Sequence, residues 1–189
     1  MSADLESAAC KPCPVAATGF NPDAVLPYGC TVNHIQKAMA DFIDFLGFIN
    51  AQVHTKGIPR MESMLMPANF SSMVGEFISA NIPKYCLGLV KNKYHNGHPD
   101  LIPSGKFPDD AVQHSAEGIE IKASRYESGW QGHNPETFSF WFSYSTATDP
   151  WIRQKGLIPN HSVLSKCWAR RLARKTGYFQ DGPEKAAGR

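Results

Sequence analysis

Two short stretches organise this chain: Asn96-Gly-His-Pro-Asp100 and, further along, Gly118-Ile-Glu-Ile-Lys122. The segment between them, residues 101–117, is rich in Pro, Gly, Asp and Ser, which is typical of turns. The sequence therefore predicts two short extended pieces joined by a loop. If the two pieces pair, Asp100 comes close to the second stretch.

The second stretch alternates strictly between apolar and charged residues. In a strand, Ile119 and Ile121 face one side, and Glu120 and Lys122 face the other. The apolar side can be buried, which leaves the two charged side chains on the open face. Together with Asp100 they form a carboxylate pair able to hold Mg²⁺ beside a lysine able to meet an anion. This is the minimum equipment for cutting a phosphodiester.

Pro99-Asp100 followed by Glu120-Ile-Lys122 resembles the PD-(D/E)XK nuclease superfamily, which includes many type II restriction endonucleases and some repair nucleases. The resemblance covers roughly residues 70–146. It implies that Asp100, Glu120 and the backbone carbonyl of Ile121 bind Mg²⁺. It also implies that Lys122 lies near the attacking water and the scissile phosphate. Glu76, on a predicted helix upstream, matches the place where the superfamily often has a further acidic residue; a structural carboxylate is the alternative.

Other acidic residues are rivals for the metal. Glu117 lies three residues before Glu120, although this odd spacing directs it to the opposite strand face. Asp109 and Asp110 become rivals if their loop folds back.

At 189 residues the chain is long enough for one domain with a substantial core. We expect neither a membrane span nor a secretory signal, since no window approaches 18 apolar residues and the N-terminal residues include Asp4 and Glu6 without an apolar stretch. Five scattered cysteines are consistent with a reducing cytosol, so we expect a cytoplasmic protein. A zinc site at Cys10-x-x-Cys13, or at His95 and His98, would need further ligands.

Charge is distributed unevenly. Residues 151–189 hold nine Lys or Arg and two acidic residues, whereas residues 1–150 hold ten and fifteen. An acidic centre beside a basic segment suits a metal site flanked by a phosphate-binding surface. A solvated basic helix explains the same asymmetry.

The periodicity predicts an α/β fold in which a central mixed β-sheet is flanked by helices, as in the restriction-endonuclease-like fold of the superfamily. Residues 1–30 are predicted to be an extended or partly disordered arm, residues 31–180 a single nuclease domain, and residues 181–189 a frayed tail. The predicted elements are a helix from Thr31 or Asn33 to about Gln52, a helix from Ser71 or Ser72 to just before Pro83, a strand at 101–103, a strand at 118–125, a strand at 137–146 and a basic helix at 163–175.

Two sets of polar residues are candidates for DNA contact. The loop after the central strand carries side chains suited to base edges or phosphates, namely Arg125, Gln131, His133 and Asn134. The predicted C-terminal helix exposes Lys166, Arg170, Arg171 and Arg174, which suit phosphates. Ordinary exposed surfaces are the alternative for both sets.

The predicted function is that of a Mg²⁺-dependent DNA endonuclease, most simply a type II restriction enzyme that cuts a short symmetric site. A homodimer is expected, since one site cuts one strand, and the helix at 33–52 has more phenylalanine than one compact face needs. A repair or nicking nuclease of the same superfamily, a non-catalytic DNA-binding protein, and a different metal enzyme built on the histidines remain as alternatives.

Overall fold

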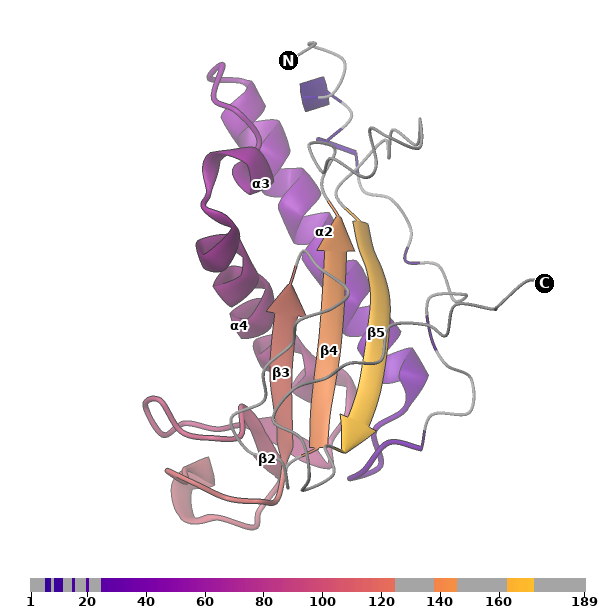
Figure 1. Ribbon diagram of the computed structural model, residues 1–189, viewed down its shortest axis with the longest axis vertical. Helices are drawn as coiled ribbons and strands as arrows, with labels where there is room; N and C mark the ends of the chain where they lie inside the picture. Colours follow the sequence, from indigo (N-terminus) through magenta and orange to yellow (C-terminus); the bar gives the residue numbers. More distant parts are fainter. Residues whose placement is uncertain are drawn as a thin grey trace, which may run out of the picture.

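A computed structural model describes residues 6, 7, 9–11, 15, 20, 25–124, 138–145 and 163–171, the last two ranges by their backbone alone (Figure 1). In chain order the elements are α2 (Val32–His54), α3 (Met61–Met64), α4 (Pro67–Tyr85), β1 (Leu89–Lys91), β2 (Leu101–Pro103), a 3₁₀ turn η2 (Pro108–Asp110), β3 (Ile119–Ser124), β4 (Phe138–Ser145) and β5 (Val163–Arg171).

Helix α2 confirms the first predicted helix. Thr31 is its N-cap: the Thr31 hydroxyl accepts a hydrogen bond from the backbone of His34, and the His34 ring accepts one from the backbone of Thr31. This reciprocal pair satisfies N–H groups that the first helical turn leaves without partners. The apolar face of the helix is buried at Ile35, Ala38, Met39, Phe42, Ile43 and Leu46, whereas Ile49 and Val53 nearer its C-terminus are half-buried.

Helix α4 differs from the second predicted helix at both ends. It begins at Pro67, four residues before the expected serine cap, and it continues through Pro83 to Tyr85. Proline is well tolerated at the first helical position, because the N–H group that it lacks has no partner inside the helix there. Pro83 lies in the last turn, where the lost hydrogen bond is near an end that frays in any case. The capping rule applied to Ser71 and Ser72 therefore placed the start too late.

The five strands form one sheet in the order β1-β2-β3-β4-β5. Strands β3 and β4 run parallel, and the other neighbours run antiparallel, so the sheet is mixed. Helix α4 packs against β1 and β3, and α2 packs against α4 and β5. In the view of Figure 1, α2 passes behind the strands. This confirms the α/β class with a mixed sheet. The strands predicted at 101–103, 118–125 and 137–146 correspond to β2, β3 and β4.

The prediction of a basic C-terminal helix is wrong over its described part. Residues Val163–Arg171 form β5, which pairs antiparallel with β4 in a register that joins Arg171 to Phe138 and Lys166 to Ser143. The expected basic helix therefore does not form over these residues. The apolar residues of this segment fit a helical period, but the segment pairs with β4 between Val163 and Arg171, with one register shift at Ser143 and Tyr144. Non-local pairing of this kind overrides local periodicity.

The hydrophobic core lies between the two long helices and the first three strands. Its largest fully buried members are Phe42, Phe70, Ile35, Met39, Ile78, Ile82, Leu89, Leu101, Ile102 and Ile119. No helix in the described part of the chain combines the length and the apolar character that crossing a membrane would require.

Described residues of the N-terminal segment contact α2 and the chain around α3. The backbone carbonyl of Ala9 accepts a hydrogen bond from Asn50, and the Glu6 carboxylate accepts one from the backbone of Arg60. The predicted tail at 181–189 lies outside the described residues.

Gly118, at the entrance to β3, gives a direct test of this packing. Its φ is +137°, and a Cβ atom there would overlap the carbonyl oxygen of Leu101 and the ring of Pro99. We expect Gly118→Ala to cost about 3 kcal/mol and to lower the melting temperature by roughly 6–12 °C. Gly75 in α4 is the matched control, because a Cβ atom there meets nothing within 4 Å. Gly75→Ala should stabilise the helix by about 0.5–1 kcal/mol. Equal melting temperatures for the two variants would contradict the β2–β3 packing.

Candidate active site

The candidate site forms where β2 and β3 separate. The two strands pair at a single position, Leu101 with Ile119, so the edge of β3 that follows is free of β2. The side chain of Asp100, just before β2, takes over there: its Oδ2 accepts a hydrogen bond of 2.6 Å from the backbone N–H of Ile121. A side-chain carboxylate thus replaces a ladder hydrogen bond and is fixed at the edge of the sheet.

The backbone of Ile121 offers a second oxygen at the same edge. The N–H and C=O groups of one strand residue point to the same side of the strand. Because the N–H of Ile121 points to Asp100, its carbonyl oxygen lies on that side too. Asp100 and the carbonyl of Ile121, two of the predicted metal ligands, therefore lie at the same edge of β3.

Glu120 and Lys122 form an ion pair along β3, with 2.6 Å between the Glu120 Oε1 and the Lys122 Nζ. The prediction that both side chains lie on an open face is wrong for Glu120, whose side chain is 8 % exposed against 20 % for Lys122. A buried carboxylate needs charged or hydrogen-bonding partners, and Glu120 has one on each side. The second partner is His98, whose Nδ1 lies 3.4 Å from the carboxylate.

The chain segment that carries His98 is held by its own backbone bonds. His98 N–H donates to the carbonyl of Gln113, and the N–H of Ser115 donates to the carbonyl of His98. The buried amide of Asn92 adds two donor bonds, to the carbonyls of Pro99 and Val112. These bonds position the residues around Asp100 without the help of a ligand.

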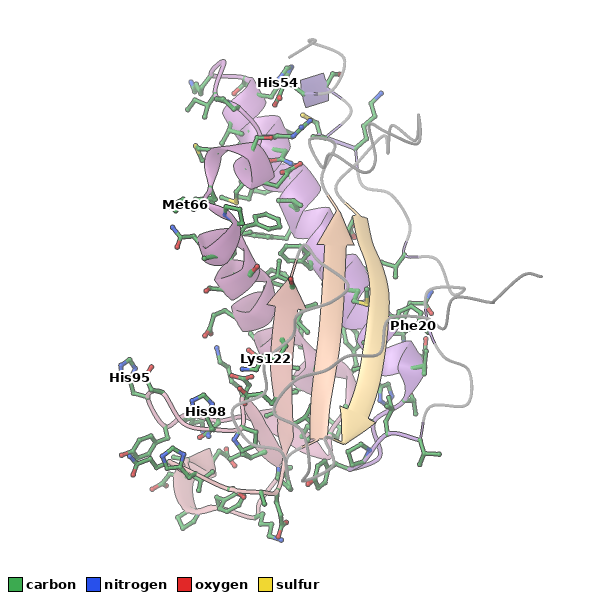
Figure 2. The ribbon with its side chains drawn as sticks, viewed as in Figure 1. Phe20, His54, Met66, His95, His98 and Lys122 are labelled. Carbon is green, nitrogen blue, oxygen red and sulfur yellow. The ribbon has the colours of Figure 1, made fainter. Side chains whose placement is uncertain are left out.

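From the sequence, His98 is a candidate only as a zinc ligand together with His95. Figure 2 shows that the two histidines separate, with His98 near Lys122 and His95 farther out on the loop. The ring of His98 stacks on that of His114, with 6.2 Å between ring centroids. The part of His98 in holding Glu120 was missed because it depends on a contact between residues 22 positions apart, for which the sequence carries no local signal.

A pocket of about 250 Å³ opens beside this cluster, between α4 and β3. Its lining residues are Ser71, Ser72, Gly75, Glu76, Asp100, Ile121, Lys122 and Ala123. Glu76 therefore lines the same pocket as Asp100 and Lys122. In this structure the Glu76 carboxylate is mostly exposed and pairs with Lys91 at 2.6 Å.

The rival acidic residues pair elsewhere. Glu117 forms an ion pair with Lys106, and Asp110 forms one with Lys93 at 3.1 Å. Asp109 lies beside Asp110 in η2 and, like Glu117 and Asp110, is not among the residues that line the pocket. The geometry thus favours Asp100, which lines the pocket, over these three residues.

Electrostatics at the site are unfavourable for a second negative charge. Burial, and then the charge of Glu120, raise the pKa of the Asp100 carboxyl to about 6, despite the opposing effects of the Ile121 N–H, Lys122 and His98. A divalent cation between the two carboxylates would offset both causes, since it supplies positive charge where burial has removed water.

The donor set fits Mg²⁺. It consists of hard oxygen atoms, which this ion prefers. Asp100 uses Oδ2 for the Ile121 N–H and retains Oδ1, and the carbonyl of Ile121 lies on the same edge. Glu120 would join them through an oxygen that now contacts Lys122 or His98.

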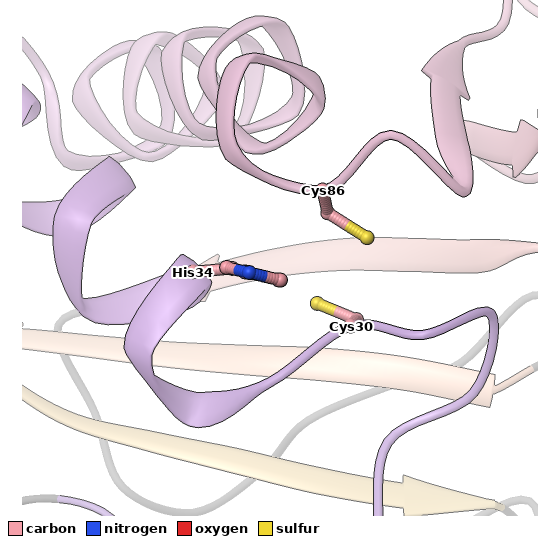
Figure 3. A group of neighbouring side chains, drawn as sticks. All are labelled: Cys30, His34 and Cys86. Carbon is pink, nitrogen blue, oxygen red and sulfur yellow. The ribbon is translucent and has the colours of Figure 1, made fainter.

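Sequence reasoning also missed a second cluster, made of Cys30, His34 and Cys86 (Figure 3). Both cysteines are buried, and burial together with the neighbouring Cys86 raises the pKa of the Cys30 thiol to about 12. The sequence holds a partial signal, because Cys30 and His34 are four residues apart at a helix start. Cys86 is remote in sequence, so only the fold brings it in. Cys10, from the pair that the sequence singled out, is a half-buried free thiol.

Most of the residues that were predicted to contact DNA lie outside the part of the chain that the structure describes. Arg125, Gln131, His133, Asn134 and Arg174 lie outside the described residues. Lys166, Arg170 and Arg171 lie in β5, at the end of the sheet order opposite to β1.

Comparison of the chain with protein-family models, with curated proteins and with solved structures found no match.

The raised pKa of Asp100 predicts how its removal changes stability in the absence of divalent cations. Between its ordinary value of 3.8 and about 6, the folded state binds more protons than the unfolded state, so Asp100 makes the fold less stable as the pH rises through this window. Asp100→Asn keeps an oxygen for the Ile121 N–H and removes the charge. We therefore expect the variant to be more stable than the parent at pH 8 by about 2–3 kcal/mol, with the difference vanishing near pH 4.

Urea denaturation in EDTA at pH 4, 6 and 8 measures this difference. Asp44→Asn is the control, because Asp44 is exposed on α2, and it should change stability by less than about 0.5 kcal/mol at each pH. If Asp100→Asn lowers stability equally at pH 4 and pH 8, the Asp100 carboxyl does not have a raised pKa in the folded protein.

Proposed function

We propose that this protein is a Mg²⁺-dependent endonuclease that hydrolyses phosphodiester bonds in DNA, with a site of the PD-(D/E)XK type. One observation carries the proposal. Asp100 is bonded to the backbone of β3 at Ile121, between Glu120 and Lys122, which pair with each other. Asp100 and Lys122 line a pocket that Glu76 also lines. Their side chains form the combination of oxygen ligands and a cation that phosphodiester hydrolysis needs.

Each residue has a role that follows from its contacts. Asp100 is anchored by the Ile121 N–H, so one of its oxygens has a fixed position at the mouth of the pocket. Glu120 is buried between Lys122 and His98, which holds its carboxylate in place. The Lys122 ammonium group is anchored on Glu120 and lines the pocket, where it can meet a phosphate oxygen or orient the attacking water.

The metal would be held by Asp100, Glu120 and the carbonyl of Ile121, with Glu76 as a further acidic group. A bound Mg²⁺ supplies positive charge that stabilises the anionic transition state and the leaving oxygen, and it acidifies water. Lys122 adds a second positive charge that is present from the start. A charge fixed before the reaction costs no reorganisation when negative charge develops.

The biological role that best suits such a site is that of a type II restriction endonuclease in the cytoplasm, acting as a homodimer on a short symmetric sequence. Two copies of the site, related by twofold symmetry, would then cut the two strands. The predicted contacts at Arg125, Gln131, His133 and Asn134 would read the bases, and Lys166, Arg170, Arg171 and Arg174 would contact phosphates. A repair or nicking nuclease with the same site is the alternative.

The central prediction concerns the charged pair on β3. Lys122→Ala and Glu120→Gln should each lower the rate of plasmid cleavage by at least about 100-fold, because Lys122 supplies positive charge to the transition state and Glu120 would hold the metal. Glu120 is buried, so the melting temperature of its variant is measured alongside the rate. Lys106→Ala is the matched control: Lys106 is an exposed lysine with a carboxylate partner, Glu117, outside the pocket. It should cleave at the parental rate.

Supercoiled, unmethylated plasmid DNA with Mg²⁺ is the substrate, and EDTA should abolish cleavage. Discrete linear fragments support the restriction role, whereas accumulation of nicked circles supports the nicking role. Normal cleavage by Lys122→Ala would show that β3 does not carry the chemistry. DNA binding without Mg²⁺-dependent cleavage would point to a non-catalytic DNA-binding protein.

A separate prediction concerns Glu76. If it contributes to metal binding, Glu76→Gln should raise the Mg²⁺ concentration needed for half-maximal cleavage several-fold. The melting temperature should hardly change, since the pair with Lys91 is exposed and is worth at most about 1 kcal/mol. Glu117→Gln, which breaks a similar exposed pair, is the control and should leave the Mg²⁺ dependence unchanged. A lower melting temperature with unchanged Mg²⁺ dependence would instead make Glu76 a structural residue.

A further inference from the structure

Three side chains with soft or borderline ligand atoms converge where α2 begins and α4 ends. Cys30 precedes the N-cap of α2, His34 lies in the first turn of α2, and Cys86 is the C-cap of α4. One ligand atom from each lies within 4.8 Å of the other two. Figure 3 shows the two cysteine side chains and the imidazole ring as neighbours between the start of α2 and the end of α4.

The spacing is close to that of a metal site. With Zn–S bonds of about 2.3 Å and Zn–N bonds of about 2.0–2.1 Å, tetrahedral geometry places neighbouring ligand atoms roughly 3.6–3.8 Å apart. The three atoms here are therefore at most about 1 Å farther apart than in that arrangement. Small rotations of the side chains would close the difference.

The backbone around both cysteines is fixed by other bonds. The N–H of Cys30 donates to Pro27, and the carbonyl of Cys86 accepts from Leu89. Tyr28 joins the two segments: its carbonyl accepts from the Cys86 thiol at 3.7 Å, and its hydroxyl accepts from the N–H of Gly118 at 2.8 Å. The sulfur atoms are thus brought together by the fold itself, so little ordering remains when a ligand binds.

A simpler account takes the cysteines as core residues and His34 as part of the helix cap. It explains the burial of the sulfur atoms, but it does not explain why an imidazole points at them. The capping bond of the ring is long, 3.3 Å from the Thr31 N–H to Nδ1, and it is exposed. Water can replace the ring at that N–H, so the ring is able to turn to a metal.

We propose that Cys30, His34 and Cys86 bind one Zn²⁺ ion, with water in the fourth position. Two thiolates and an imidazole select zinc over Mg²⁺, which prefers the oxygen atoms of the pocket at β3. The ion links the start of α2 to the end of α4 and so stabilises the contact between the two long helices. This site shares no residue with the candidate active site and does not rest on the proposed nuclease function.

The test uses the full-length protein, reduced and stripped of metal with EDTA, and titrates it with Zn²⁺ against a chromophoric chelator. We expect one ion to bind per chain and the melting temperature to rise by several degrees, because the ion binds the folded state. Co²⁺ in place of Zn²⁺ should give thiolate charge-transfer bands and the visible bands of tetrahedral cobalt.

His34→Gln is the sharpest variant. Glutamine at this position retains the reciprocal cap with Thr31, so the helix start survives while the imidazole is lost. The zinc affinity of this variant should fall by at least about 10–100-fold, which is the usual effect of losing a residue that only supports a metal ligand. Cys86→Ala should do the same. Cys10→Ser is the control, because Cys10 belongs to the rival Cys-x-x-Cys pair, and it should bind zinc as the parent does.

Several outcomes would overturn the proposal. They are absence of zinc binding at micromolar concentration, unchanged affinity in His34→Gln, loss of binding in Cys10→Ser alone, or a Cys30–Cys86 disulfide in protein purified without reductant. If Cys86→Ala fails to fold, the titration of His34→Gln and the cobalt spectrum of the parent still decide.

Discussion

The candidate active site depends on the hydrogen bond between the Asp100 carboxylate and the N–H of Ile121. It forms because β2 leaves β3 after a single paired position, so the next N–H on that edge needs another acceptor. A strand that continued the ladder would satisfy the N–H but leave no room for a ligand. The carboxylate satisfies the same group and keeps a second oxygen beside the pocket. One bond therefore ends the pairing of two strands and places the first acidic group of the site.

Two carboxylates, Asp100 and Glu120, and two basic side chains, Lys122 and His98, surround this bond. Asp100 is held in its position at the cost of a raised pKa, because the fold places it in a buried setting near Glu120. Glu120 is more deeply buried but lies between two basic side chains, Lys122 and His98. The Ile121 N–H, Lys122 and His98 offset only part of the cost of charging Asp100, so its pKa stays raised. A divalent cation is the partner that would compensate both carboxylates.

The rest of the fold gives this edge a rigid base. Helix α4 supplies one wall of the pocket and packs on β1 and β3, while α2 packs on α4 and reaches β5. The buried amide of Asn92 and the bonds between His98, Gln113 and Ser115 hold the loops in place. The proposed zinc ion would act on this base, where α2 begins and α4 ends, and not on the chemistry of the pocket.

The sequence by itself determined the elements whose periodicity is strong and whose partners are local. Helix α2 follows from its apolar stripe and its threonine cap, and β3 follows from the alternation of Ile119, Glu120 and Ile121. The motif also named Asp100, Glu120 and Lys122 as a group. Only the tertiary structure decided that Glu120 is buried, that His98 holds it, that residues 163–171 form a strand, and that Cys86 meets Cys30 and His34. Each of these depends on contacts between residues distant in sequence, and local periodicity carries no information about which distant segment will satisfy a backbone or a charge.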